Sequence, residues 1–476
     1  MFCNNPIFEV TLGFNINIMP ESNNRVQFLG AAGTVTGSKY LLHLNDKKIL
    51  VDCGLFQGLK PLRELNWNEF PVDPSTIDCV LLTHGHLDHC GYLPRLVKQG
   101  FSGHIFCTAP TADLATIILK DSAKIQEEDA AYANLKGFSK HSPALPLYNL
   151  DDVEATIPLF YPVEVDKLVD FENKISFRFR RDAHIPGAAF IELRVNDKWI
   201  VFSGDLGRPN DPMLLPPEYP EQADYLFVES TYGDREHSEE PTEDILLRII
   251  NDSLLKHGPL FVSSFTVDRA QDFMYLIWKL KQENKIPDLP VYLDSPMGVD
   301  VSKLFLKYPE WQIINPEVFQ DVFKNTRMVH SVEETRALAR NKNPHIVIAG
   351  SGMMNGGRIL EYLESQLGNP NATFVLPGYQ AEGTRGRTLA EGGQSLKLRG
   401  KYYYVKATIE HITTMSSHAD QSEIIDWVSH LQHPPKQVFV VHGEKTSAET
   451  LQQKLTELFG WNAVVPKLMD EFPLEV

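Results

Sequence analysis

A dense cluster of potential metal ligands stands between Thr83 and His89, where THGHLDH follows the apolar run CVLL. The cluster holds His84, His86, Asp88 and His89. Neutral imidazole nitrogens and carboxylate oxygens bind a divalent cation directly, whereas four such groups buried together without a partner would be costly. The spacing therefore predicts a metal centre on a turn at the end of a strand.

Three further polar residues follow apolar runs, where strands are expected to end. They are Asp52 in ILVDCG, His184 in RRDAHIPGAAF and Asp205 in IVFSGDLG. An aspartate beside glycine is by itself ordinary turn chemistry. An ionised carboxylate after a run as apolar as IVF, however, needs a cation or hydrogen-bond donors. Together with the histidine cluster, these residues resemble a specific arrangement.

The pattern around these residues predicts sheets covered by helices. Between Asn24 and about Leu206, apolar runs such as VQFLG, YLLHL, KKILVDCG and AFIELRV alternate with Gly, Pro and Asp turns. Helical patterns stand between them, one over Leu93 to Lys98 and a longer one opened by Thr111. This alternation indicates an α/β architecture.

After about Glu229 the pattern changes to long helices, ILLRIINDSLLKHG and DRAQDFMYLIWKLKQENK, followed by strands that run into Gly-rich turns. A second α/β unit is therefore predicted over residues 236–408. Strand and helix patterns then resume and end in the helix SAETLQQKLTELFG.

Composition narrows the class of protein. The 476 residues are enough for two or three cores, and 43% hydrophobic with 22% charged residues excludes a disordered or fibrous chain. Five cysteines in so long a chain do not form a disulfide framework. The sequence shows no secretory signal pattern and no apolar run of membrane-spanning length, so a soluble cytoplasmic protein without membrane contact is expected.

The net charge of −17 is unevenly distributed. Between Glu240 and Glu410 there are 20 basic and 20 acidic residues, so the excess acid lies entirely in the remainder. Near the end of the second unit, six basic residues stand against the single acid Glu391: Arg385, Arg387, Lys397, Arg399, Lys401 and Lys406. This stretch predicts either a solvated basic face or a surface that holds phosphates.

The motifs HGHLDH, the later histidine, SGD and the early DCG resemble the metallo-β-lactamase superfamily of dinuclear metal hydrolases. Glu229 in VESTYGDR, His418 in SSHAD and His442 in VVHGE are similar to three motifs of its β-CASP branch of RNA- and DNA-cleaving nucleases. GSGMMNGGR and GYQAEGTRGRTL resemble signatures of the cap domain of that branch. The resemblance extends from about Val26 to the C-terminal helix.

The resemblance implies an αββα metallo-β-lactamase sandwich with an inserted α/β β-CASP cap domain. The expected divisions are a tail over 1–23, the first part of the metallo-β-lactamase domain over 24–235, the cap over 236–408 and the second part over 409–476. The cap is an insertion because implied metal ligands, Asp205 and His442, stand on either side of it.

The resemblance also implies two divalent cations, with zinc as the first choice and manganese as the alternative. One ion would take His84, His86 and His184, the other Asp88, His89 and His442, and Asp205 would bridge them. Asp52 would orient the ligands. Two cations ~3.5–4 Å apart can share a hydroxide that attacks a phosphodiester.

The leaving alkoxide of such a reaction needs a proton, which a histidine can supply. The resemblance gives this general-acid role to His418 and makes Glu229 the carboxylate that holds its imidazole. A neighbouring carboxylate would raise the pKa of that histidine and keep it charged.

Two Gly-rich segments of the cap are weaker candidates for binding phosphate. Ser351, Gly352 and Met353 precede Arg358 and a helix, and helix N-termini bind anions. Gly383, Thr384 and Arg385 stand in the second cap signature. For these residues, and for Ser263 and Gln271, a purely structural role is the competing interpretation.

Other features are interpreted structurally. The small-residue loop Gly30–Ser38 is taken as a hairpin and Cys90 as a packed thiol. Tyr402–Tyr404 is expected to form a strand packed on both faces, with base stacking as the alternative.

The function expected from these residues is cleavage of single-stranded RNA by a two-metal phosphodiesterase, internally or from the 5′ end, in which a metal-bound hydroxide attacks and His418 is the general acid. The alternatives are a DNA nuclease of the same branch, a hydrolase of small molecules and a non-catalytic scaffold subunit. By resemblance, a histidine at the position of His442 favours RNA. A homodimer is left open.

Overall fold

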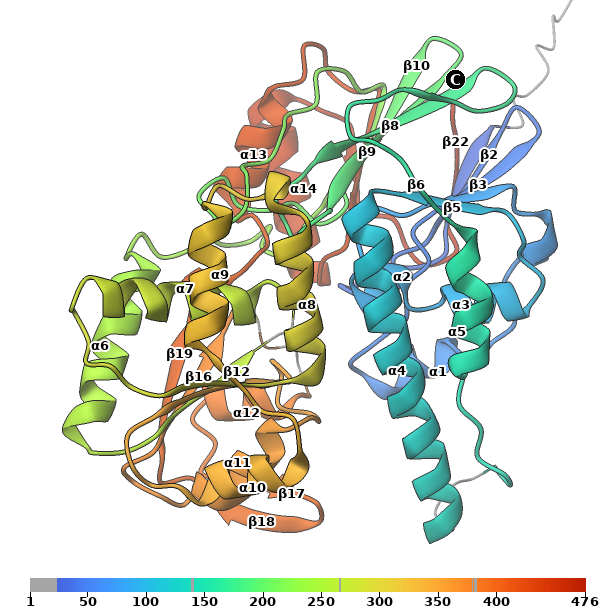
Figure 1. Ribbon diagram of the computed structural model, residues 1–476. Helices are drawn as coiled ribbons and strands as arrows, with labels where there is room; N and C mark the ends of the chain where they lie inside the picture. Colours follow the sequence, from blue (N-terminus) through green and yellow to red (C-terminus); the bar gives the residue numbers. More distant parts are fainter. Residues whose placement is uncertain (1–23, 138–140, 265–266, 379, 381–382) are drawn as a thin grey trace, which may run out of the picture.

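The computed structural model describes residues 24–137, 141–264, 267–378, 380 and 383–476. Two units are visible in Figure 1. One is a sandwich of two seven-stranded sheets, and the other is built on a six-stranded sheet. The fold class predicted from the sequence, a sandwich with an inserted α/β unit, is confirmed.

The first sheet of the sandwich combines an antiparallel and a parallel part. Strands β22, β1, β2 and β3 pair antiparallel, whereas β3 to β6 pair parallel. In spatial order the strands are β22 (Glu471–Pro473), β1 (Arg25–Phe28), β2 (Tyr40–Leu44), β3 (Lys47–Val51), β4 (Cys79–Leu81), β5 (His104–Cys107) and β6 (Phe160–Pro162).

The second sheet has four parallel strands, β10, β11, β20 and β21, beside an antiparallel group. Its order is β21 (Ala463–Val464), β20 (Gln437–Val441), β11 (Tyr225–Glu229), β10 (Lys198–Phe202), β9 (Ala189–Val195), β8 (Ile175–Arg181) and β7 (Val169–Asp170). Alternate residues of both sheets meet in an aromatic core, in which Phe28 lies 5.7 Å from Phe227 and 5.2 Å from Phe439 between ring centroids.

Helices cover both outer faces of the sandwich. On the first sheet lie α3 (Leu93–Lys98), α4 (Ala109–Lys136) and α5 (Leu150–Thr156), and on the second lie α13 (Gln421–Ser429) and α14 (Lys445–Phe459). Short helices α1 (Lys60–Leu65) and α2 (Leu87–Cys90) lie in connections. The αββα layering follows from these positions.

Helix α4 begins two residues earlier than the sequence predicts. Thr108 caps it, because its hydroxyl accepts the backbone N–H of Thr111 at 3.3 Å. The helix ends at Gly137, whose φ of 65° is favourable without a side chain. Thr111 is thus the third residue of the helix and not its first.

The second unit is a parallel sheet between two layers of helices. The order is β14 (Arg327–Met328), β13 (Val291–Asp294), β15 (Ile346–Gly350), β12 (Leu260–Ser264), β16 (Thr373–Pro377) and β19 (Thr408–Ile412). Alternate residues of β12 separate the layers: Leu260 and Val262 pack on one side, and Phe261 on the other.

The helices of this unit divide accordingly. One layer holds α6 (Thr242–Leu255), α7 (Arg269–Gln282), α8 (Pro296–Lys307) and α9 (Pro316–Asn325). The other holds α10 (Val332–Arg340), α11 (Ile359–Gln366), α12 (Arg385–Ala390) and the hairpin β17 (Ser395–Leu398) and β18 (Lys401–Tyr404). Strand β19 pairs with β16 as far as Ile412, beyond residue 408, where the cap domain was expected to end. The limits of the four predicted segments stay a prediction.

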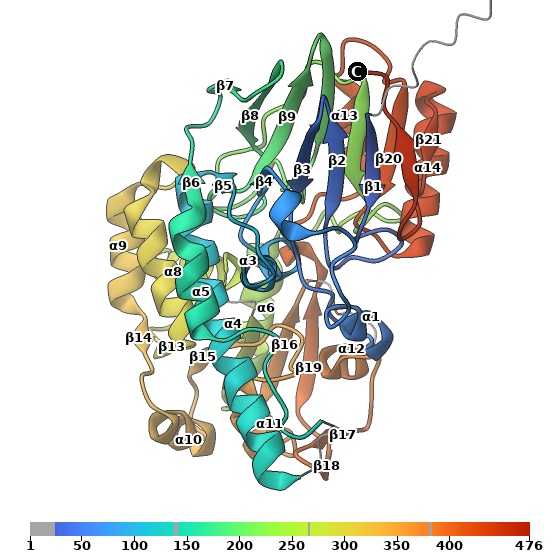
Figure 2. The same cartoon turned by 90° about the vertical axis from the view of Figure 1, so that its right-hand side faces the viewer.

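The two units are packed together along α4 and α8, which lie side by side in Figure 2. Asp113 of α4 accepts hydrogen bonds from Lys307 at 2.5 Å and from the hydroxyl of Tyr308 at 2.8 Å. The helices share one apolar cluster that extends from the sandwich into the second unit.

No helix in the described ranges has both the length and the apolar run that crossing a membrane requires. The four described cysteines are buried and unpaired with one another, and Cys90 donates to the carbonyl of Gly85 at 3.3 Å. The interpretation of Cys90 as a packed thiol is confirmed.

A buried charge cluster, which the sequence did not predict, joins the units at the start of α7. Arg269 lies 2.5 Å from Asp272, 2.8 Å from Asp268 and 3.8 Å from Asp211 of the sandwich. Burial raises the pKa of Asp268 and of Asp272. The guanidinium is the only cation that the described residues place among these three carboxylates.

We expect Arg269→Met to lower the free energy of unfolding by about 3–5 kcal/mol, because it leaves buried carboxylates without their cation. Chemical denaturation followed by circular dichroism measures this change. Arg248→Met is the matched control, because its ion pair with Glu240 is exposed and contributes about 1 kcal/mol or less. Equal denaturation midpoints for the two variants would contradict the importance given to the cluster.

Candidate functional site

The predicted site residues lie where parallel strands end. Asp52 directly follows β3, and Thr83 stands two residues after β4. In the other sheet, Asp205, Glu229 and His442 stand at or just after the ends of β10, β11 and β20. Ligand sites form outside the carboxyl ends of parallel strands because these ends share one edge of the sheet.

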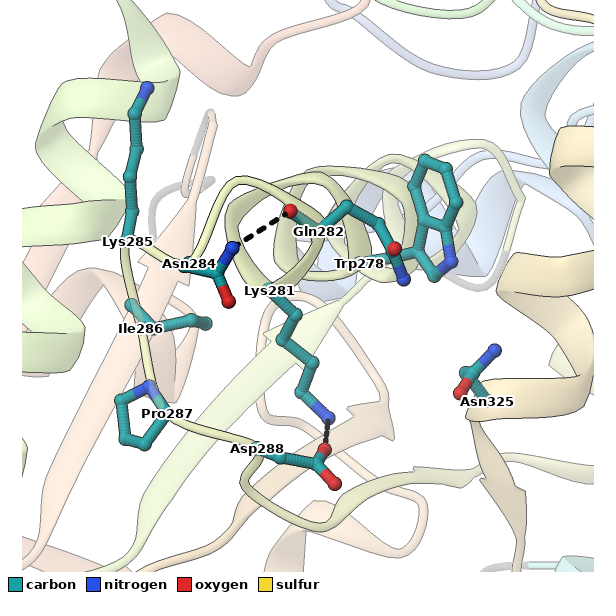
Figure 3. A pocket seen from close by; sticks show the side chains of 9 residues that line it. All are labelled: Trp278, Lys281, Gln282, Asn284, Lys285, Ile286, Pro287, Asp288 and Asn325. Carbon is teal, nitrogen blue, oxygen red and sulfur yellow. Dashed lines mark hydrogen bonds and ion pairs between the residues drawn. The ribbon is translucent and has the colours of Figure 1, made fainter.

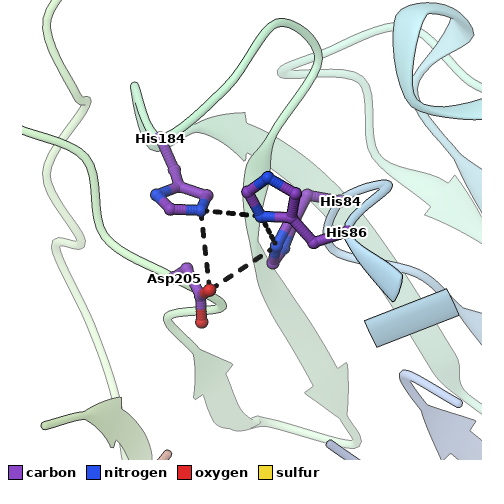
Figure 4. A group of neighbouring side chains, drawn as sticks. All are labelled: His84, His86, His184 and Asp205. Atoms are coloured by element: carbon purple, nitrogen blue, oxygen red, sulfur yellow. Dashed lines mark hydrogen bonds and ion pairs between the residues drawn. The ribbon is translucent and has the colours of Figure 1, made fainter. Parts of the chain in front are cut away.

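A first group of side chains converges in Figure 4. Nδ1 of His86 lies 3.2 Å from Nε2 of His84 and 3.1 Å from Nε2 of His184. Oδ2 of Asp205 lies 3.5 Å from Nε2 of His84 and 3.5 Å from Nε2 of His184. All four residues could offer one ligand atom to the same ion.

A second group lies on the other side of Asp205. Nε2 of His89 and Nε2 of His442 are 3.2 Å apart, and Asp88 lies 3.5 Å from the latter nitrogen. Oδ1 of Asp205 lies 3.2 Å from Nε2 of His89 and 3.3 Å from Nδ1 of His442, which is not the ring nitrogen that faces Asp88 and His89. Asp205 therefore faces both groups, one with each oxygen.

The spacing of these atoms fits a metal ion. Ligands ~2.0–2.1 Å from a tetrahedral zinc ion are about 3.3 Å from one another, and the distances within each group are close to this value. Oδ1 of Asp205 is buried and receives no hydrogen bond from the described residues. A cation between the groups would satisfy that oxygen.

The pKa values also suit metal ligands. Burial first, and then the neighbouring imidazoles, hold the pKa of His84 and His184 well below the usual range, and burial lowers that of His86 to about 4. These three rings are neutral and can bind a cation. His89 differs: burial lowers its pKa, but Asp205 and Asp52 raise it well above the usual value, so positive charge is favoured there.

A layer of hydrogen bonds orients the rings from behind. Asp52 lies 2.7 Å from Nδ1 of His89 and accepts the backbone N–H of Thr83 at 2.8 Å. The carbonyl of Ser417 lies 3.3 Å from Nδ1 of His184, and the hydroxyl of Thr231 lies 3.2 Å from Nδ1 of His442. Contacts of this kind set which ring nitrogen faces a metal.

The predicted acid pair is also in contact. Nδ1 of His418 lies 3.0 Å from Glu229, and Nε2 lies 4.0 Å from Asp205. Glu229 is buried and accepts the backbone N–H groups of Leu206 at 2.7 Å and Thr231 at 3.1 Å. Burial lowers the pKa of His418, but Glu229 and Asp205 more than offset this effect and raise it to about 9.

Three residues of the site have a left-handed backbone conformation although they are not glycine. The φ angles are 57° at Asp52, 65° at Ala183 and 46° at His442. Such conformations cost of order 1–3 kcal/mol each and are maintained only by their surroundings. At Ala183, Gly207 makes this possible, because a Cβ on Gly207 would lie 1.9 Å from the carbonyl carbon of Ala183.

One detail of the predicted metal cluster was wrong, and several contributors were missed. Asp88 and His89 lie in the short helix α2 and not on a turn. The buried carboxylate of Asp182 accepts the backbone N–H of His184 at 3.1 Å, and burial raises its pKa. The sequence could have indicated Asp182, because it stands in RRDAH, two residues before His184. No feature of the sequence indicated Thr231 or Ser417.

The two Gly-rich segments of the second unit contact each other. The N–H of Gly386 donates to the carbonyl of Met353, and that of Arg385 donates to the side chain of Asn355. Ser351 accepts the N–H of Met354, and Gly352 accepts the hydroxyl of Ser263. Residues 379, 381 and 382 of the second signature lie outside the described part of the chain.

The remaining candidates have structural contacts. Arg358 donates to Asp294 at 3.1 Å, to the carbonyl of Ser331 and to Thr335, so its guanidinium is committed to the interior of the second unit and gives no support to a phosphate-binding role. Gln271 donates to Gly298 and Ser302.

Two interpretations of small motifs have different outcomes. The loop Gly30–Ser38 has the tight backbone of a structural turn, because a Cβ on Gly30 would lie 1.7 Å from the carbonyl oxygen of Gly37. The expectation that Tyr402–Tyr404 packs on both faces is wrong: Tyr402 is 69% exposed and Tyr404 is 74% exposed.

A separate hollow of about 540 Å³ lies at the end of α7 and is lined by Trp278, Lys281 and Asp288 among others (Figure 3). Lys281 is paired with Asp288 at 3.0 Å. The described lining of the hollow contains none of the histidines of the site and no group of metal-ligating side chains.

Comparison with known families finds three matches between residues 32 and 466. Residues 32–251 match the metallo-β-lactamase superfamily, residues 270–389 match the β-CASP domain and residues 402–466 match the Zn-dependent metallo-hydrolase RNA specificity domain. The three matches follow the order that the motifs predicted.

Similar proteins extend over most of the chain. Ribonuclease TTHA0252 of Thermus thermophilus is 34% identical over 94% of this chain and all of its own length. The transcription termination factor FttA of Methanocaldococcus jannaschii is 28% identical over 94% of this chain and 71% of its own length. An RNase J-like protein of the same organism is 29% identical over 84% of this chain and 87% of its own.

A crystal structure of a protein of unknown function from Enterococcus faecalis has the same fold, with a TM-score of 0.53 at 14% identity over 95% of this chain and all of that one. The sequence motifs, the sandwich with its inserted unit and the similar proteins all indicate the same family. The chain belongs to the β-CASP branch of the metallo-β-lactamase superfamily and, within that branch, to the metal-dependent RNA nucleases.

Proposed function

We propose that this enzyme hydrolyses single-stranded RNA with two divalent cations held by the seven converging side chains. The observation that carries the proposal is the position of Asp205, whose two oxygens face two separate groups of imidazoles. The ribonuclease name of a relative that is 34% identical over its whole length supports RNA as the substrate.

Each group would hold one cation. His84, His86 and His184 would bind the first, Asp88, His89 and His442 the second, and Asp205 both. When bound, the cations supply Lewis-acid activation of water and neutralise charge on the phosphodiester. Nitrogen and carboxylate donors without thiolate suit zinc, and manganese is the alternative.

The chain itself supplies the proton for the leaving group. His418 points Nε2 toward Asp205 and Nδ1 toward Glu229. This arrangement leaves the Nε2 proton free to move to the departing oxygen, and Glu229 would stabilise the charged ring. Asp52 would orient His89, and Asp182 would fix the backbone that carries His184.

The choice of RNA over DNA belongs to this proposal, as does internal cleavage or cleavage from the 5′ end. A homodimer and a cytoplasmic location stay predictions. A non-catalytic scaffold receives no support, because all seven implied ligands come together.

The direct test is incubation of zinc-loaded or manganese-loaded enzyme with 5′-labelled single-stranded RNA bearing a monophosphate or a triphosphate, beside DNA of the same sequence. We expect cleavage of RNA, little cleavage of DNA and loss of activity in His84→Ala. Gel products distinguish internal from 5′-end cleavage. Intact RNA with both metals would refute the proposal, and preferential cleavage of DNA would establish the alternative nuclease.

The pH dependence of kcat tests the acid pair. Since His418 must be protonated and Glu229 raises its pKa, kcat should fall as pH rises through that raised pKa. Glu229→Gln removes a charge that raises this pKa, so the falling limb should move to lower pH. An unchanged limb would contradict the role of Glu229, and His418→Ala should lower kcat by about 10²–10⁴-fold.

Metal content tests the orienting role of Asp52. We expect Asp52→Asn to weaken metal affinity by about 10–100-fold, because His89 loses the carboxylate behind it. Competition with a chromophoric chelator measures this affinity. Asp300→Asn is the matched control, because Asp300 is exposed on α8 and pairs only with Lys303 among the contacts described for it; a similar loss in both variants would contradict a specific role for Asp52.

A further inference from the structure

The hairpin β17–β18 has two dissimilar faces. In its register Leu396 lies opposite Tyr403, and Lys397 lies opposite Tyr402. Leu396 and Leu398 are buried, and Tyr403 packs with them against the cap domain. Alternation along a strand places Tyr402 and Tyr404 on the other face, where both are mostly exposed.

This outer face has the spacing of a stacking surface. Residues two apart on one strand are about 6.7 Å apart, so the two exposed tyrosines stand next to each other on this face. Nζ of Lys397, from the opposite strand, lies 5.7 Å from the centroid of Tyr402. The two exposed tyrosines and this lysine together form a small aromatic and basic patch.

The charge around the hairpin is positive, although less than the sequence suggested. Arg387 is paired with Glu391, and Arg399 with Glu361 and Glu364. These two arginines are therefore neutralised.

The other cations of this stretch keep their charge available. Arg385 donates to the backbone carbonyls of Lys397, Met354 and Asn355, and no carboxylate among the described residues pairs with it. No acidic partner lies within ion-pair distance of Lys397, Lys401 or Lys406 among the residues that the structure describes.

We propose that this face, formed by Tyr402, Tyr404 and Lys397 with Arg385 at its border, is a second contact site for single-stranded RNA, an inference that rests on the proposed function. Bases would stack on the two tyrosines, and phosphates would approach Lys397 and Arg385. Stacking tolerates any base, because every base has a π face.

The observations favour RNA over a protein partner. Among the described residues the outer face offers aromatic rings and cations with no aliphatic side chain between the two tyrosines, a combination that suits stacked bases and phosphates. The hairpin lies at the end of the cap domain that is remote from the sandwich strands in Figure 1. Only a strand long enough to reach both places would use it.

The site predicts a length-dependent loss of affinity. In the cleavage-inactive His84→Ala background, Tyr402→Ala/Tyr404→Ala should weaken binding of a fluorescent RNA of about 30 nucleotides by about tenfold or more, measured by anisotropy. Binding of a hexanucleotide should change little. Tyr402→Phe/Tyr404→Phe should retain affinity, and Lys397→Ala should lower the salt dependence by about 0.7 in log Kd per log salt.

Tyr161→Ala, at a half-exposed tyrosine of the sandwich, is the matched control. Equal affinity of the double alanine variant and this control for the long RNA would overturn the inference. Unchanged RNA affinity with a smaller sedimenting mass would instead identify the face as a contact between copies. Failure of the wild-type enzyme to cleave RNA refutes the proposed function alone, since the binding comparison does not depend on cleavage.

Discussion

The buried carboxylate of Asp205 is the interaction on which the site depends. Each of its oxygens faces a different pair of imidazoles. One of the two oxygens, Oδ1, receives no hydrogen bond from the described residues. A charge so placed is unfavourable unless cations or donors surround it. The neighbouring rings are therefore arranged around it on two sides, and most of them are held neutral by burial, as ligands must be.

The scaffold places these groups by bringing strand ends to one edge. The site residues, of which Asp52 is the first in the chain and His442 the last, meet at this edge. They do so because β3 and β4 are parallel in one sheet, and β10, β11 and β20 are parallel in the other. Asp52 and His442 adopt left-handed backbone conformations at this edge. The packed aromatic core between the sheets, and the hydrogen bonds behind each ring, maintain that strain.

The cap domain has a different electrostatic character from the sandwich. Its charges balance, and the excess acid lies in the remainder of the chain. Two arginines of its basic stretch, Arg387 and Arg399, form ion pairs with glutamates. The lysines around β17–β18 have no acidic partner among the described residues. An acidic enzyme can thus present a local basic and aromatic surface to a polyanion, because the field near a surface depends on nearby charges.

Local sequence determined the order of the domains and which residue types are available as ligands, because these depend on short motifs and on the periodicity of apolar residues, while the role of His418 as general acid is a proposal. Tertiary structure decided what depends on distant partners. The hydrogen bonds of Ser417 and Thr231 to the rings, the Arg269 cluster and the pairing of Arg358 with Asp294 join residues far apart in the chain. The exposure of Tyr402 and Tyr404 could not be predicted from the sequence either. Alternation along a strand identifies its two faces but not the face that the rest of the cap domain covers.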